Sequence, residues 1–331
     1  MMKRYLLIVV LAASGVGAAW AIQTPRPEGL RVAAGPSSKV VDAGRLLEDV
    51  RVLAGDEMEG RGAGTEGGAR ARAYLLRRFA EAGLKPLGGD SFEQSFDLKA
   101  RGEVKPRRGV NLVGYVRGTR SPERLVVVTA HYDHVGLRGG KVYNGADDNA
   151  SGVAALLQIA AHFARHPPRH GFVFAALDAE ETGLQGAYEL VRRLREERRD
   201  VALNVNLDMV GHSERGELYA SGTHHNPSLK APIERAAARS RVKLLLGHDR
   251  PEQGRDDWTN QSDHYAFHRA GVPHVYFGVE DHKDYHQPTD DFETITQDFF
   301  VGAAETILGA LEELDASPIP EPRKKADRPN L

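Results

Sequence analysis

Three apolar segments of the sequence each end directly before side chains that can bind a metal ion or transfer a proton. These side chains are His131 and Asp133 after residues 125–130, Glu180 and Glu181 after residues 172–177, and Asp208 after residues 203–207. In open α/β sheets, ligands bind beyond the carboxyl ends of the strands. If the three segments are strands, we expect these side chains to meet at one edge of a sheet.

Two further segments carry groups of the same kind. Asp148 lies in the run Gly145–Gly152 before an expected helix, and His286 lies in the polar loop Asp284–Asp291. Each group has a simpler explanation when taken alone, since Asp148 could cap the helix and Glu180 could begin another one. A cluster of buried carboxylates, however, is costly without positive charge, and bound metal ions would supply that charge.

The candidate ligands suit two metal ions. They are His131, Asp148, Glu181, Asp208 and His286. If one carboxylate bridges the ions, each ion receives one imidazole, one terminal carboxylate and the shared group, which leaves a position for water as in catalytic zinc sites. Two ions about 3.5–4 Å apart can activate that water and polarise a carbonyl group. We expect two zinc ions per chain, although manganese or cobalt also suits such ligands.

Two residues have expected roles in the reaction itself. Asp133 lies two residues after His131, and side chains at i and i+2 of an extended chain point the same way. Asp133 can therefore accept a hydrogen bond from the ligand imidazole and orient it. Glu180 is expected to be the general base that moves a proton from the water to the leaving amine. Spacing alone leaves the roles of Glu180 and Glu181 interchangeable.

Five motifs in this order resemble a family of co-catalytic zinc peptidases that includes bacterial leucyl aminopeptidase, aminopeptidase Y and the catalytic domain of glutamate carboxypeptidase II. The motifs are Ala130–His134, Gly145–Gly152, Glu180–Gly186, Asn206–Met209 and Tyr285–Pro288. Together with the upstream segment Arg61–Gly67, the similarity covers residues 41–316.

The resemblance implies the site in more detail. It implies a zinc-dependent exopeptidase fold in which the ligands are His131, Asp148 as the bridge, Glu181, Asp208 and His286. It also implies that Glu180 is the base and that Asp133 orients a ligand. In the family the peptide bond after the bridging aspartate is cis, which here is the bond between Asp148 and Asn149.

Strand and helix patterns alternate along the chain. Apolar runs typical of strands lie at residues 110–116, 125–130, 172–177, 203–207 and 272–277, and helical patterns lie at 65–82, 150–165, 184–195, 227–240 and 299–314. Continuous apolar strands separated by helices predict an α/β fold. We expect a single domain over residues 41–316, with a mixed, mostly parallel central sheet and helices on both faces.

The first predicted helix has a definite start and a candidate core face. Thr65 can accept a hydrogen bond from the first turn as its N-cap. The small apolar residues on one face at helical spacing are Ala69, Ala73, Leu76 and Ala80. These residues mark a candidate apolar face, and Gly83 can end the helix.

The amino-terminal segment predicts export. Lys3 and Arg4 precede an apolar core, and Ala19-Trp20-Ala21 has the pattern cut by signal peptidase, so residues 1–21 are expected to be a signal peptide. An uncleaved signal anchor is the alternative. We expect a periplasmic or secreted chain whose mature part is not stably inserted in a membrane. Residues 22–40 are typical of a linker and 317–331 of a disordered tail.

Composition excludes several classes of protein. The formal net charge of -2 leaves no basic excess to bind nucleic acid. The absence of Cys excludes disulfides, thiolate metal sites and a cysteine nucleophile, so His, Asp and Glu must hold any metal. The sequence carries no signal of an oligomeric state.

The expected activity is hydrolysis of the N-terminal bond of peptides by an exported two-zinc aminopeptidase. A one-zinc glutaminyl cyclase on a related fold and a carboxypeptidase of the same family are the alternatives. The run Asp147–Gly152 favours the peptidase, because the cyclases usually lack it. No expected ligand is missing, which disfavours a non-catalytic binding module. Either Glu180 or the loop Asp256–His264 could recognise a free N-terminus, although that loop could equally be a structural turn.

Overall fold

The computed structural model describes residues 36–99 and 107–319 of the chain. The predicted signal peptide therefore lies outside the described residues, as do most of the predicted linker and tail. Within the described part, residues 36–40 and 317–319 form neither helix nor strand. None of the described helices is both long enough and apolar enough to cross a bilayer.

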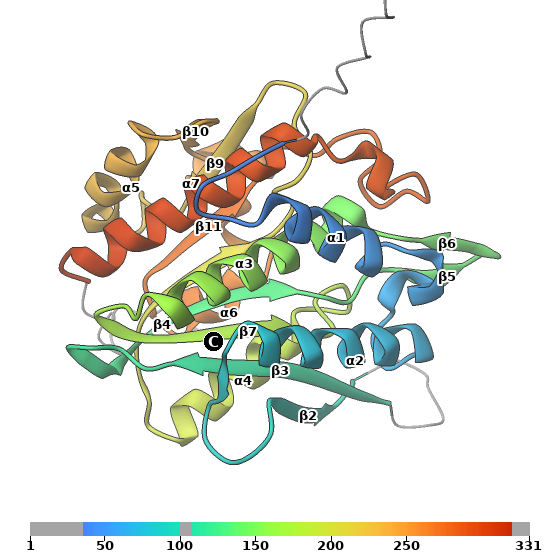
Figure 1. Cartoon of the computed structure of the whole chain (residues 1–331), viewed down its shortest axis with the longest axis horizontal. Coiled ribbons are helices and arrows are strands. Elements are labelled where there is room, and N and C mark those ends of the chain that lie inside the picture. Colours follow the sequence, from blue (N-terminus) through green and yellow to red (C-terminus); the bar gives the residue numbers. More distant parts are fainter. Residues whose placement is uncertain (1–35, 100–106, 320–331) are drawn as a thin grey trace, which may run out of the picture. The chain divides into compact units, whose positions relative to one another are not determined.

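A central sheet of nine described strands forms the middle layer of the fold (Figure 1). Its strands, in spatial order, are β1 (Lys85–Pro86), β3 (Arg108–Val116), β7 (His170–Leu177), β4 (Ser121–His131), β8 (Asp200–Leu207), β11 (His274–Gly278), β9 (Glu217–Ser221) and β10 (Lys243–Leu246), with β2 (Glu93–Asp97) paired to β3. A separate hairpin pairs β5 (Gly136–Arg138) with β6 (Lys141–Tyr143).

The parallel strands occupy the centre of this sheet. β7, β4, β8 and β11 run parallel, while β3 pairs antiparallel with β7, and β9 pairs antiparallel with β11. The mixed α/β sheet in a single domain is therefore confirmed. The strand at residues 110–116 has the apolar composition of the central strands but runs the opposite way, which composition alone could not reveal.

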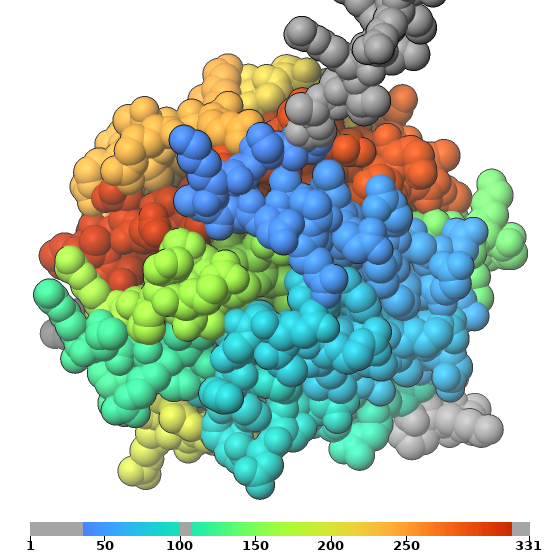
Figure 2. All heavy atoms as spheres, in the orientation of Figure 1, coloured from blue at the N-terminus to red at the C-terminus, as the bar shows by residue number. Residues whose placement is uncertain are grey.

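Helices cover both faces of the sheet. One face carries α1 (Ala43–Leu53), α2 (Glu66–Glu81), α3 (Gly152–Arg165) and α7 (Gln297–Ala316), the other α4 (Gln185–Glu196) and α6 (His264–Arg269), and α5 (Lys230–Ala237) packs against α7. Alternate residues of β4 separate the two apolar cores, with Val126 and Val128 in the first and Leu125 and Val127 in the second. In the space-filling view, helices of the first group lie in front of the middle of the sheet, and parts of its edge remain visible (Figure 2).

Short helical turns connect these elements. Five are 3-10 turns: η1 (Asp56–Arg61), η3 (Pro227–Leu229), η4 (Pro251–Asp256), η5 (Trp258–Asn260) and η6 (Phe292–Thr294); the sixth, η2 (Ala146–Ser151), is a π-type turn. The helix predicted over residues 227–240 is thus two pieces, η3 followed by α5, and it ends earlier than expected.

Helix α2 confirms its predicted cap and corrects its predicted core face. The Thr65 hydroxyl accepts a hydrogen bond from the Gly68 amide at 3.2 Å. The core, however, receives Ala71, Leu75 and Phe79, whereas Ala73 is exposed. The larger side chains bury more apolar area than a row of alanines, so they decide which face turns inward.

Candidate metal centre

The expected strand-end residues do lie together. β4 ends at His131, and the neighbouring strands β7 and β8 end at Leu177 and Leu207, just before the acidic residues. These three strands are adjacent and parallel, so their carboxyl ends share one edge of the sheet. The loop after β11 and the turn before α3 bring His286 and Asp148 to the same place. A single small cavity is lined by His131, Asp148, Glu180, Asp208 and His286.

The candidate ligands form two groups that share Asp148. One group consists of His131, Asp148 and Asp208, and the other of His134, Asp148, Glu181 and His286. Within each group the candidate ligand atoms lie within 4.8 Å of one another. The shared carboxylate uses one oxygen for each group: Asp148 Oδ1 is 3.4 Å from His131 Nε2, and Asp148 Oδ2 is 3.1 Å from His286 Nε2. This is the arrangement that a bridging carboxylate requires.

Unpartnered buried atoms indicate that the second group fits a metal ion. His134 Nδ1 lies 2.8 Å from Glu181 Oε1 and 3.5 Å from Asp148 Oδ2. Despite this closeness, neither His134 Nδ1 nor Glu181 Oε1 has a hydrogen-bond partner of suitable geometry. Nitrogen and oxygen atoms crowded together without hydrogen bonds are typical of a cation site. A zinc ion would satisfy both atoms.

The charges in the cavity also call for a cation. Burial raises the pKa of the Glu180 carboxyl well above its ordinary value, and the charges of Asp263 and Asp208 raise it further. Burial likewise raises the pKa of Asp208, and the Asp148 charge adds to that rise. Carboxylates that resist ionisation when no cation is present are the kind that metal ions stabilise.

Asp133 and Glu180 are linked in a way that the sequence did not indicate. The carboxylate of Asp133 lies 3.8 Å from His131 Nδ1, and the hydrogen bond to that imidazole is instead made by the Asp133 backbone carbonyl at 3.1 Å. Asp133 Oδ1 accepts a hydrogen bond from the Glu180 amide at 3.0 Å. The Asp133 carboxylate thus lies close to the ligand imidazole without hydrogen-bonding to it, and it also positions the Glu180 backbone.

The turn that carries Asp148 is held from several sides. The peptide bond between Asp148 and Asn149 is cis, as the resemblance implied. The Asp290 carboxylate accepts hydrogen bonds from the Asp147 and Asp148 amides at 2.9 and 3.0 Å. Asn149 donates to the Leu207 carbonyl at 2.9 Å, which ties the turn to β8. Asp148 therefore does not cap α3, because its carboxylate points into the cavity.

Asp208 is fixed by a chain of polar side chains. Ser262 Oγ donates to Asp208 Oδ2 at 2.6 Å, and Asn206 donates to Ser262 at 2.8 Å. The other oxygen, Asp208 Oδ1, is left facing His131 Nε2 at 3.2 Å. Ser262 belongs to the loop that was a candidate for recognising an N-terminus. In that loop, Asp257 accepts hydrogen bonds from Thr259 and serves as a turn residue.

Arg61 is a buried cation behind the centre, and the sequence analysis did not find it. Its guanidinium is fully buried and donates to backbone carbonyls at 2.5–2.8 Å; the acceptors belong to Leu53, Tyr132, Asn144 and Gly145. Burial lowers the pKa of Arg61 to about 10, although the Asp148 charge opposes that change. One side chain thus ties the segment of His131 to the turn of Asp148. A lone Arg in a Gly-rich segment gives no sequence signal of such a role.

Replacing Arg61 with Met should destabilise the fold by roughly 3 kcal/mol, because several buried carbonyl oxygens would lose their donor. The measurement is the free energy of unfolding from a denaturant titration. Arg120→Met is the matched control, since Arg120 is exposed, and it should change stability by less than about 0.5 kcal/mol. Equal stabilities of the two variants would contradict the role assigned to Arg61.

Two cavities of different size meet at the metal centre. The smaller, of about 60 Å³, holds Glu180 and is walled by the side chains Met209, Trp258, Gln261, Tyr276, Val279, Asp281 and Tyr285. The larger, of about 540 Å³, lies on the side of His134 and Glu181 and includes Arg107 and Arg138. His286 lines both, so the centre separates a confined space from an open one.

Comparison with known proteins identifies the family. Residues 111–311 match peptidase family M28, and this span is more than half of the 331 residues. The chain therefore belongs to peptidase family M28. It is 32% identical over 246 residues to aminopeptidase YwaD of Bacillus subtilis, an alignment that covers 70% of this chain and 50% of YwaD. The chain spans about half the length of the curated relatives it matches.

Solved structures share the fold. The zinc aminopeptidase BSAP from Bacillus subtilis matches with a TM-score of 0.64 and 19% identity, covering 82% of this chain and 94% of BSAP. A glutaminyl cyclase from Porphyromonas gingivalis matches with a TM-score of 0.67 and 18% identity, covering 83% of this chain and 99% of the cyclase. At these identities the matches establish the fold, and they do not decide between the two reactions.

Proposed function

We propose that this protein is an aminopeptidase that binds two zinc ions and releases the N-terminal residue of peptides. The observation that carries the proposal is the pair of ligand groups joined through the two oxygens of Asp148. Family membership and the similarity to YwaD support a peptidase. His131 and Asp208 would hold one ion, and Glu181, His286 and His134 the other.

The chain's own residues account for proton transfer. Zinc, when bound, would polarise the peptide carbonyl and make water a stronger nucleophile. Glu180 lines the cavity beside both groups and is not a member of either, so it is free to accept a proton from the attacking water. The same carboxyl can then donate the proton to the leaving amine. The Asp133 carboxylate holds the Glu180 backbone in place for this step.

The unequal cavities suggest how a peptide lies across the centre. The small cavity, of about 60 Å³, is confined, whereas the larger one, of about 540 Å³, offers more space for a continuing chain. The terminal residue would enter the small cavity, and the rest of the peptide would leave through the larger one. This arrangement favours exopeptidase over endopeptidase activity.

The test combines metal analysis with a substrate panel. The purified chain is assayed on aminoacyl chromogenic substrates and on a peptide with N-terminal Gln, and bound zinc is measured by mass spectrometry. The proposal expects about two zinc ions per chain and chelator-sensitive release of terminal residues. Pyroglutamate formation with about one zinc per chain would instead establish a glutaminyl cyclase.

His134 gives a separate test of the metal site. We expect His134→Ala to weaken the binding of one zinc ion about 10- to 100-fold and to leave the other unchanged, because only one group contains His134. A titration against a chromophoric zinc chelator resolves the two affinities. His166→Ala removes an exposed imidazole and serves as the control. Two unchanged affinities in His134→Ala would show that His134 is not a ligand.

We also propose that the chain is exported through its first 21 residues. The support is the basic, apolar and small-residue pattern of that segment. Intact-mass measurement of the protein from its native host would find a chain that begins at Ile22 if the signal peptide is removed. A chain that retains residues 1–21 would indicate the uncleaved anchor.

A further inference from the structure

One acidic side chain of the small cavity has no part in the proposed chemistry. The carboxylates that line this cavity belong to Asp148, Glu180, Asp208 and Asp281. The first three are accounted for as ligands or base. Asp281 lies on the loop between β11 and His286, and it shares the wall with aromatic side chains. Its position in the cavity therefore calls for a separate explanation.

The charge of Asp281 is not compensated within the described residues. Its carboxylate makes no hydrogen bond or ion pair among them, and the residue is exposed where it lines the cavity. Burial raises the pKa of the Asp281 carboxyl, and the imidazoles of His282 and His286 offset this rise only in part. The His282 ring is already engaged, since its Nε2 lies 3.1 Å from Asp147 Oδ2. The Asp281 carboxylate is therefore available to pair with a cationic group of a ligand.

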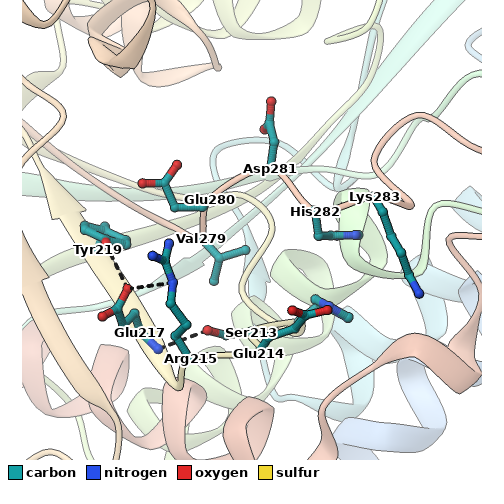
Figure 3. A pocket seen from close by; sticks show the side chains of 11 residues that line it. Ser213, Glu214, Arg215, Glu217, Tyr219, Val279, Glu280, Asp281, His282 and Lys283 are labelled. Atoms are coloured by element: carbon teal, nitrogen blue, oxygen red, sulfur yellow. Dashed lines mark hydrogen bonds and ion pairs between the residues drawn. The ribbon is translucent and has the colours of Figure 1, made fainter.

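A second hollow continues beyond Asp281. This cavity, of about 400 Å³, shares Val279 and Asp281 with the small one. Glu280 and Asp281 extend from the same loop into its upper part, and Lys283 extends away from them (Figure 3). Arg215 Nε forms an ion pair with Glu217 Oε2 at 3.3 Å, so the guanidinium of Arg215 already has a partner. The rim between the two cavities is therefore acidic.

The cavity wall that contains Asp281 also carries aromatic and aliphatic side chains. Trp258, Tyr276 and Val279 supply aromatic and aliphatic surface, and the Tyr276 and Trp258 rings lie 5.7 Å apart between centroids. Apolar walls pack against methylene groups, and aromatic faces also attract cations. The Asp281 carboxylate in the same wall attracts a cation directly. A slot of this kind matches a side chain that is apolar along its length and positive at its tip.

We propose that the small cavity selects peptides with a basic N-terminal residue, whose side-chain ammonium or guanidinium group binds the Asp281 carboxylate. This inference rests on the proposed aminopeptidase function and adds the substrate class. A Lys or Arg side chain would lie along the aromatic wall and reach the acidic rim. A neutral side chain of equal length would cover the carboxylate without pairing it, which is unfavourable.

The test compares lysyl and norleucyl substrates, whose side chains share the same four-carbon chain and differ in the terminal ammonium group of lysine. Wild-type protein should have a higher kcat/KM for the lysyl substrate. Asp281→Asn should lower kcat/KM for lysyl and arginyl substrates about 10- to 100-fold while changing the norleucyl value less than about threefold. Glu280→Gln is the matched control on the same loop, and it should preserve most of the preference for lysine.

Each alternative outcome is distinct. Equal losses on lysyl and norleucyl substrates in Asp281→Asn would mean that Asp281 binds the free α-amino group or shapes the site, and would overturn the proposal. So would a wild-type protein that hydrolyses norleucyl substrates better than lysyl ones, although its aminopeptidase activity would still stand. Failure of the zinc-loaded wild type to release any terminal residue would overturn the aminopeptidase function and this inference with it.

Discussion

Replacing Glu180 with Gln should lower kcat about 1,000-fold and leave the zinc content unchanged. A positioned general acid or base typically contributes 10²- to 10⁴-fold to a rate. Glu180 lines the cavity between the two ligand groups but belongs to neither, so its loss removes a proton acceptor and not a ligand. Gln keeps the size of the side chain and cannot accept the proton. The measurements are steady-state kinetics on an aminoacyl substrate and zinc content by mass spectrometry.

Glu181→Gln is the matched control for this experiment. Glu181 is the neighbour of Glu180 in sequence and a member of one ligand group, so its replacement should weaken the binding of one zinc ion. The pair of variants therefore separates loss of the base from loss of a ligand. If Glu180→Gln lost zinc and Glu181→Gln kept it, the two roles would be exchanged.

Asp148→Ala should remove both zinc ions and abolish activity. Asp148 is the one residue that the two groups share, and each of its oxygens faces a different imidazole. Without the Asp148 carboxylate, each of the two groups loses one ligand. Metal affinity falls steeply when a ligand is lost, because zinc requires several donors in a fixed geometry. Zinc bound per chain after dialysis against buffered zinc measures the effect.

Asp208→Ala provides the comparison for Asp148→Ala. Asp208 belongs to one group only, so about one zinc ion per chain should remain. Far-ultraviolet circular dichroism establishes that both variants are folded. Retention of both ions in Asp148→Ala would show that Asp148 does not bridge, and the two-metal proposal would then fail.

Local sequence signals predicted much of the fold. The strands at 125–130, 172–177 and 203–207 appear as the cores of β4, β7 and β8, because continuous apolar runs are characteristic of strands buried on both faces. The Thr65 cap is also confirmed, since a cap depends on neighbours within one turn. These features depend on residues close together in the chain.

Local sequence signals could not predict the direction of one strand, the buried face of α2 or the division of a predicted helix. The reversed direction of β3 depends on how distant strands pair. The inward face of α2 was mispredicted because two faces carried apolar residues, and the larger Leu75 and Phe79 packed inward. Helix 227–240 was likewise divided by its tertiary context. Strand direction and helix rotation are decided by packing against elements that lie far away in sequence.

In the candidate site, too, some features follow from local sequence and others from tertiary packing. The sequence by itself supplied the ligand types, because His, Asp and Glu follow strands whose carboxyl ends meet at one edge. Only the tertiary structure brought His134 into a ligand group, set Arg61 behind the centre and placed Asp281 in the cavity wall. His134 and Arg61 lay in segments that carry the family resemblance, but nothing in those segments indicated these roles, and Asp281 lay in no motif. Their roles depend on burial and on partners far away in sequence, and those are fixed only when the chain packs.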